Sequence, residues 1–231
     1  MKPSFNPLAY KIYLRLGALF IAALVASNLI FKKFFYWNFF DWHTFEISVG
    51  VLPYPVTFLI TDLISEIYGK KKANQVVISG MFASVFSLLI IYTASVVPAT
   101  QWSPIDDDLF QKVFGATTLA VFASMSAYLI AQLIDIQLYH FWKRKTKGKH
   151  LWLRNNFSTF FSQFIDTFTV VFLLCVFKEI SWELFGGLLV SGFLFKVLIA
   201  AIDTPFLYFG VYLFRKKFKL KPQQELNIDY I

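Results

Sequence analysis

Long apolar runs alternate with short polar or basic stretches along almost the entire chain. Each run holds at least the roughly 20 residues that an α-helix needs to cross a bilayer. The runs predict about six transmembrane helices, at residues 12–31, 45–68, 73–97, 112–142, 155–177 and 183–214. We therefore expect an all-α integral membrane protein with a single transmembrane domain over residues 1–231.

Composition agrees with this pattern. Hydrophobic residues make up 57% of the chain and the mean hydropathy is +0.58, too apolar for a protein that hides such side chains in one soluble core. Lys2, Lys11 and Arg15 precede the apolar residues 16–31 of the first span, as in a signal peptide, but no obvious soluble protein follows them. We expect this run to be an uncleaved first span.

Most of the 22 Lys and Arg residues lie in clusters between the apolar runs, and the net charge is +8. Because short basic loops are retained on the cytoplasmic side, these clusters predict cytoplasmic N- and C-termini. The loop with Asp106, Asp107 and Asp108 is then expected outside. No nucleic-acid partner is expected, since the basic residues are not gathered on one folded face. The predicted location is the bacterial inner membrane, crossed several times.

Ionisable side chains occur inside four of the predicted spans. A charge at the bilayer centre costs about 2.5–3.5 kcal/mol on insertion scales, so it persists where it is paired, hydrated or functional. The polar residues are Asp62 and Glu66 on the second span, Gln132 and Asp135 on the fourth, Gln163 and Asp166 on the fifth, and Lys196 and Asp203 on the sixth. Spacings of three, four and seven place each pair on one helix face. These faces can line one cavity, or Lys196 can simply neutralise a buried aspartate.

Prolines accompany these charges on two spans. Pro53 and Pro55 precede the two carboxylates of the second span, and Pro205 follows Asp203 by two residues. Proline removes a backbone donor, so both sites predict a break in a helix, as a plain kink or as part of a transporter site. A short sequence similarity between residues 132–135 and 163–166 leaves an inverted repeat, with three helices in each half, as an open alternative.

The chain lacks the motifs of soluble enzymes. It has no phosphate-binding glycine loop, no HExxH helix and no serine elbow, and His43, His140 and His150 are isolated. Cys175 is the only cysteine, so a thiolate metal cluster is not expected. We expect no cofactor, no metal and no enzymatic activity; polar groups inside the bilayer instead indicate transport of a small molecule.

Three segments carry a family resemblance. They are residues 60–70, with the sequence ITDLISEIYGK, residues 131–137, with AQLIDIQ, and residues 153–167, which include LRNNFST and SQFIDT. Together they resemble the queuosine-precursor transporter family, also grouped as putative vitamin uptake transporters. The resemblance extends over about residues 16–214.

The resemblance implies import of 7-cyano-7-deazaguanine and 7-aminomethyl-7-deazaguanine, a nucleobase salvage that supplies queuosine for tRNA modification. Import would proceed by facilitated diffusion or by proton coupling. Glu66, Asp135 and Asp166 would accept hydrogen bonds from the edge of the base or carry protons. Side-chain amides would donate to the carbonyl of the base, and aromatic rings would stack on its face. The expected substrate-binding residues are Asp62, Glu66, Gln132, Asp135, Arg154, Asn155, Asn156, Gln163, Asp166, Lys196 and Asp203, with Arg154, Asn155 and Asn156 at the cytoplasmic mouth of the fifth span.

Other interpretations stay open at this point. The chain carries no ATP-binding motif, so it can act alone or as the substrate-binding subunit beside a separate ATPase. A membrane-embedded enzyme that modifies lipid, with carboxylate pairs as acid and base, is a further alternative. The bilayer and a deazaguanine are the expected partners, and a homodimer is also open.

Overall fold

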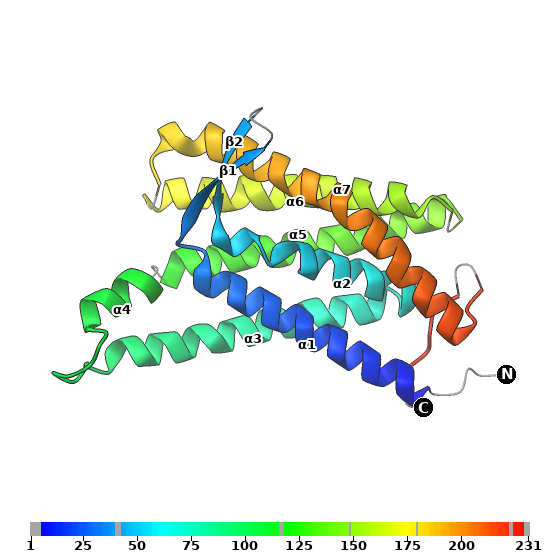
Figure 1. Cartoon of the computed structure of the whole chain (residues 1–231), viewed down its shortest axis with the longest axis horizontal. Helices are drawn as coiled ribbons and strands as arrows, with labels where there is room; N and C mark the ends of the chain where they lie inside the picture. Colours follow the sequence, from blue (N-terminus) through cyan, green and yellow to red (C-terminus); the bar gives the residue numbers. More distant parts are fainter. Residues whose placement is uncertain are drawn as a thin grey trace.

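The computed structural model describes residues 6–39, 43–115, 118–147, 149–178, 180–221 and 224–228, and long helices dominate them (Figure 1). The helices are α1 Pro7–Ile30, α2 Tyr54–Ile67, α3 Lys70–Val96, α4 Asp107–Phe114, α5 Thr118–Lys145, α6 Leu151–Val176 and α7 Phe185–Phe218, with 3-10 turns at η1 Val49–Val51 and η2 Trp182–Leu184. Two short strands, β1 Phe34–Phe39 and β2 His43–Ser48, pair in an antiparallel hairpin.

Five of the described segments are long and apolar enough to cross a membrane. They are Pro7–Ile30, Val49–Ile67, Lys70–Val96, Leu151–Val176 and Trp182–Phe218. Helix α5 has 28 residues, which is also long enough to cross a bilayer, but it is less apolar over its length than the other long helices. It lies beside α6 and α3. The prediction of a helical, multi-pass membrane protein is confirmed.

The distribution of side chains is that of a protein solvated by lipid. Large apolar side chains lie on the outside, with Phe82 77% and Phe209 61% exposed. Polar side chains lie inside, and Gln132, Asp135 and Ser162 are fully buried. Because hydrocarbon cannot satisfy polar groups, the polar faces turn toward one another in the interior.

The loops separate into two ends. The α2–α3 and α5–α6 connections, the start of α1 and the end of α7 lie together at one end of the bundle, on the right in Figure 1. We call this the basic end, because it carries Lys70 to Lys72, Lys143 to Lys145 and Arg215 to Lys217. Helix α4 and the α6–α7 connection lie at the opposite end.

The second predicted span is wrong at its beginning. Residues 45–48 form strand β2, and α2 starts only at Tyr54. Pro53 is the N-cap of α2 and Pro55 lies in its first turn, where a missing backbone N–H costs no hydrogen bond. The expected break within this helix is therefore wrong, and the prolines mark its start.

The hairpin follows a two-residue periodicity. Phe45 and Ile47 are buried and pack with Phe195 of α7, while Phe34 and Tyr36 on the paired strand are exposed. Trp37 packs edge-on against Phe195, with ring centroids 5.5 Å apart. The hairpin thus attaches the segment before α2 to the side of α7.

The fourth and sixth predicted spans also need correction. Residues 112–114 end the separate helix α4, which closes at Gly115, and the membrane helix begins at Thr118. Helix α7 runs from Phe185 to Phe218 through Pro205, so the break expected there is wrong. Directly before the proline, the Thr204 hydroxyl donates to the Ala200 carbonyl at 3.0 Å.

Candidate functional site

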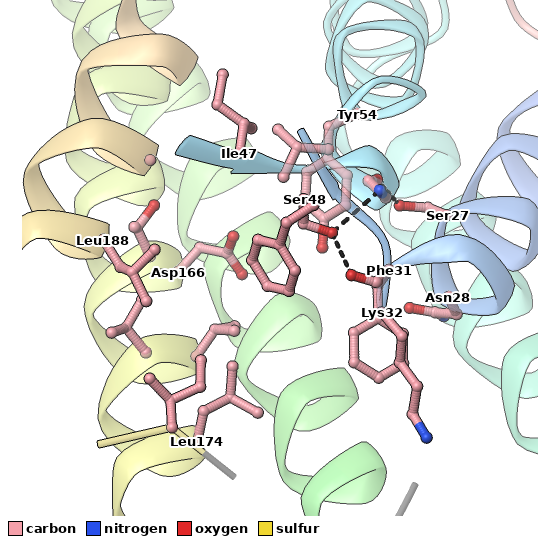
Figure 2. Close-up of a pocket in the computed structure, with 18 of the residues that line it drawn as sticks. Ser27, Asn28, Phe31, Lys32, Ile47, Ser48, Tyr54, Asp166, Leu174 and Leu188 are labelled. Carbon is pink, nitrogen blue, oxygen red and sulfur yellow. Dashed lines mark hydrogen bonds between the residues drawn. The ribbon is translucent and has the colours of Figure 1, made fainter. Parts of the chain in front are cut away.

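A cavity of about 480 Å³ opens between α1, β2, α2, α6 and α7, toward the end opposite the basic end. Its walls include Phe31 directly after α1, Leu174 near the end of α6 and Leu188 near the start of α7 (Figure 2). The volume lies in the range of small-molecule sites, which are concave, largely apolar and equipped with a few polar groups.

An ion pair lies at the inner part of this cavity. Lys196 Nζ of α7 lies 2.5 Å from Asp166 Oδ2 of α6, and it also lies over the ring of Tyr54, 5.1 Å from its centroid. Asp166 is buried, and its Oδ1 has no hydrogen-bond partner among the described residues. The cavity therefore offers an unused carboxylate oxygen, an ammonium and an aromatic face close together.

The wall beside α1 is formed by tight backbone packing. The Ser48 hydroxyl donates to the Phe31 carbonyl at 2.5 Å and accepts from the Gly50 N–H at 3.1 Å (Figure 2). Ser27 donates to the Gly50 carbonyl. A Cβ at Gly50 would lie 2.8 Å from the Phe31 Cα and the Ser27 carbonyl oxygen, so the 3-10 turn can approach α1 only with glycine there.

Several lining residues were not among the predicted site residues. The polar and aromatic-polar ones are Ser27, Asn28, Lys32, Glu46, Ser48, Tyr54, Lys112 and Thr167. Ser27 and Asn28 interrupt an apolar run, which is the kind of signal that identified the carboxylates. Tyr54, between two prolines, had no such signal, because an aromatic residue at a helix start is usual in a membrane protein.

A second void, of about 20 Å³, adjoins this cavity on the inner side. Tyr54 and Lys196 line both spaces, and Thr159, Gln163 and Asp203 line the second one. Its volume can hold about one water molecule. The void thus lies between the cavity and the polar interior of the bundle.

That interior is a layer of buried polar side chains from α2, α5 and α6. Asp62 and Asp135 lie within hydrogen-bonding reach of each other. The Ser162 hydroxyl donates to Asp135 Oδ1 at 2.9 Å, and Gln132 donates to the Tyr128 hydroxyl at 2.8 Å. Several side chains of this layer keep buried atoms without a partner among the described residues, among them Asp62, Gln132, Asp135 and Gln163.

Glu66 lies at the basic end, away from the cavity. Arg154 Nη2 lies 2.7 Å and Lys143 Nζ 3.6 Å from Glu66 Oε2, while Arg215 Nη2 lies 2.6 Å from Oε1. The Tyr139 hydroxyl also donates to Glu66 Oε2 at 3.0 Å. We call these five residues the Glu66 cluster. It joins α2, α5, α6 and α7, and Glu66 is fully occupied by its partners.

Asn155 and Asn156 belong to the same end of α6. Both amides donate to the Thr204 hydroxyl of α7, at 3.4 Å and 3.0 Å respectively. The eleven predicted residues are therefore distributed over three levels: Asp166 and Lys196 at the cavity, Asp62, Gln132, Asp135, Gln163 and Asp203 in the middle, and Glu66, Arg154, Asn155 and Asn156 at the basic end. Within the part of the chain that the structure describes, no three His, Cys, Asp or Glu side chains could hold a metal ion.

Comparison with known proteins agrees with a membrane transporter. A family model described as "Putative vitamin uptake transporter" matches residues 48–210. A protein of Bacillus subtilis named "Probable queuosine precursor transporter" is 27% identical over 164 residues, 70% of this chain and 70% of that protein. A protein of Haemophilus influenzae with the same name is 27% identical over 171 residues, 69% of this chain and 66% of that protein. No solved structure matches the chain. The residues matched by the family model include the hairpin's last residue, α2 to α6 and most of α7, so the chain belongs to the putative vitamin uptake transporter family.

Proposed function

We propose that this protein imports 7-deazaguanine precursors of queuosine across the bacterial inner membrane, and that the 480 Å³ cavity is the substrate site. The observation that carries the proposal is the pairing of Asp166 and Lys196 beside Tyr54 at the inner part of that cavity. The names of the two relatives support the substrate class.

The ion pair complements the edge of the base. A 7-deazaguanine presents a carbonyl oxygen, a ring N–H and an exocyclic amine in a row. A carboxylate has about four lone-pair sites and an ammonium three donors, so both keep capacity beyond their mutual contact. Asp166, with its unpartnered Oδ1, can accept from the N–H and the amine, and Lys196 can donate to the carbonyl. Tyr54 lies beside them as an aromatic surface for the ring.

The two ends of the bundle differ in a way that suits import. The cavity lies between segments of the end opposite the basic end, while the Glu66 cluster connects four helices at the basic end. If the basic end faces the cytoplasm, as the positive-inside rule predicts, the cavity takes up substrate from outside. Transport then requires the Glu66 cluster to separate.

Growth of cells that cannot make the precursor tests this function. Such cells are supplied with external 7-cyano-7-deazaguanine and scored for queuosine in tRNA. We expect queuosine with the wild-type gene and a severe loss with Asp166→Asn at equal protein level in the membrane. Asp108→Asn, which removes an exposed carboxylate from α4, is the matched control and should behave as wild type. No difference between cells with and without the gene would contradict the function.

A further inference from the structure

We propose that Asp62 and Asp135 form a proton-carrying pair that couples substrate uptake to proton entry. This rests on the proposed import function and names its driving ion. The two carboxyl groups come from α2 and α5, are almost completely buried, and lie within hydrogen-bonding reach of each other. They occupy the middle of the bundle, between the cavity and the Glu66 cluster.

The close approach of the two carboxyl groups favours a proton shared between them. Two adjacent carboxylates away from water repel each other strongly, and a proton between them removes this repulsion. Among the described residues, no Lys or Arg side chain forms an ion pair with Asp62 or Asp135. A hydrogen bond between the two carboxyl groups therefore needs a proton on one of them.

Each carboxyl group of the pair has one buried oxygen that accepts no hydrogen bond from the described residues. Asp62 Oδ1 and Asp135 Oδ2 are buried and have no partner among the described residues, while Ser162 occupies Asp135 Oδ1 at 2.9 Å. In the ordinary chemistry of such a pair, one shared proton leaves one negative charge, and a second proton makes the site neutral. One proton per cycle can thus be bound and released.

The charged groups around the pair do not neutralise it. On α7, Asp203 adds a negative charge near Asp62, and Glu66 lies one helical turn further along α2. On α6, Arg154 attracts Asp62, but its Nη2 is held 2.7 Å from Glu66. On α5, Tyr139 also donates to Glu66. The hydroxyls of Ser158, Thr159 and Ser162 surround Asp135 from α6.

Polar side chains lie between the pair and the cavity. Tyr54 and Lys196 separate the cavity from the smaller void, which Thr159, Gln163 and Asp203 also line. Both amide atoms of Gln163 are buried and have no partner among the described residues, so this side chain can donate to, or accept from, a water molecule in the void. In the proposed route, water in the void and the Asp203 carboxylate carry the proton from the cavity to the pair, since an amide cannot carry it. The proton leaves to cytoplasmic water when the Glu66 cluster separates.

Proteoliposomes with the full chain and a pH dye inside test the coupling. With the outside one pH unit more acidic, coupling to one proton supports up to about tenfold accumulation of labelled 7-cyano-7-deazaguanine, because one unit corresponds to a factor of ten. We expect the wild type to accumulate substrate and to acidify the lumen when substrate is added. Asp62→Asn and Asp135→Asn should still exchange labelled for unlabelled substrate at equal pH, without accumulation or acidification. Asp108→Asn should match the wild type.

The outcomes separate the two proposals. Wild-type exchange that does not respond to the pH gradient, or asparagine variants that accumulate like the wild type, would overturn the coupling and leave the import function intact. A wild type that shows no exchange at all would overturn the import function. If the asparagine variants do not fold, Ser162→Ala replaces them. Loss of its donated hydrogen bond disfavours the ionised form of Asp135, so the pH dependence of accumulation should move to higher pH, and an unchanged profile contradicts the proposal.

Discussion

Arg154 of α6 and Glu66 of α2 form a buried ion pair with a distance of 2.7 Å, although 88 positions separate the two residues in the sequence (154 minus 66). Arg215 and Lys143 approach the same carboxylate. Glu66 therefore connects helices α2, α5, α6 and α7 at the basic end.

Glu66→Gln should destabilise the folded protein substantially. Removal of one member of a buried ion pair typically costs about 3–5 kcal/mol, because the remaining charges lose their compensation. Thermal unfolding in detergent measures the effect. Glu225→Gln is the control, since this side chain is 44% exposed and its pair with Lys143 should contribute less than about 1 kcal/mol. Equal melting temperatures for the two variants would contradict the role of Glu66.

Asp166 and Lys196 should behave as a unit. Lys196→Met leaves a buried carboxylate unpaired, and Asp166→Asn leaves a buried ammonium, so each single variant should lower the melting temperature. The double variant should recover part of this loss, because neither charge then remains unpaired. It should still fail to bind substrate in a binding assay with purified protein. Additive destabilisation, or binding by the double variant, would show that the pair is not the recognition element.

The charge of the substrate should matter. The cavity is lined by Lys32, Lys112 and Lys196 but only by two carboxylates, Glu46 and Asp166. This balance disfavours the cationic aminomethyl compound relative to the neutral nitrile. In competition against the labelled nitrile, the amine should therefore need a several-fold higher concentration than the unlabelled nitrile does. A tenfold difference in this concentration corresponds to about 1.4 kcal/mol. The difference should diminish in high salt, because Lys32 and Lys112 are exposed. Preference for the amine would contradict this charge argument.

Gly50→Ala should distort the cavity wall. The added methyl group would lie 2.8 Å from backbone atoms of α1 that cannot move aside, and overpacking of this kind costs about 1–3 kcal/mol. Gly187→Ala in α7 is the matched control, since nothing lies within 4 Å of a Cβ at that position. Uptake and melting temperature should both fall for the first variant only. A normal Gly50→Ala protein would mean that the turn next to α1 adapts without affecting the cavity.

The long spans could be predicted from the sequence, because a helix that crosses a bilayer needs a run of about 20 apolar residues. The buried carboxylates could be predicted because a charged residue is conspicuous within such a run. The hairpin could not. Phe45 and Ile47 read as part of an apolar run, and their alternate burial depends on packing against Phe195, about 150 residues later in the chain. Sequence spacing also could not show which side chains contact each buried carboxylate. Asp62 and Glu66 share one helix face, yet Asp62 meets another carboxylate and Glu66 meets three cations, since the neighbouring helices supply opposite charges at the two levels.

The segment after α7 is attached to the basic end of the bundle by three contacts, one of which involves the Glu66 cluster. The Leu226 N–H donates to the Ile67 carbonyl at 2.7 Å, and Ile228 is buried beside the hydrophobic core. Glu225 reaches Lys143 from the same segment. The segment thus acts as a strap across the end of α2, and helices cannot part at the basic end without loosening it. A fluorophore placed in this segment would therefore report each opening of the protein without touching the transported molecule.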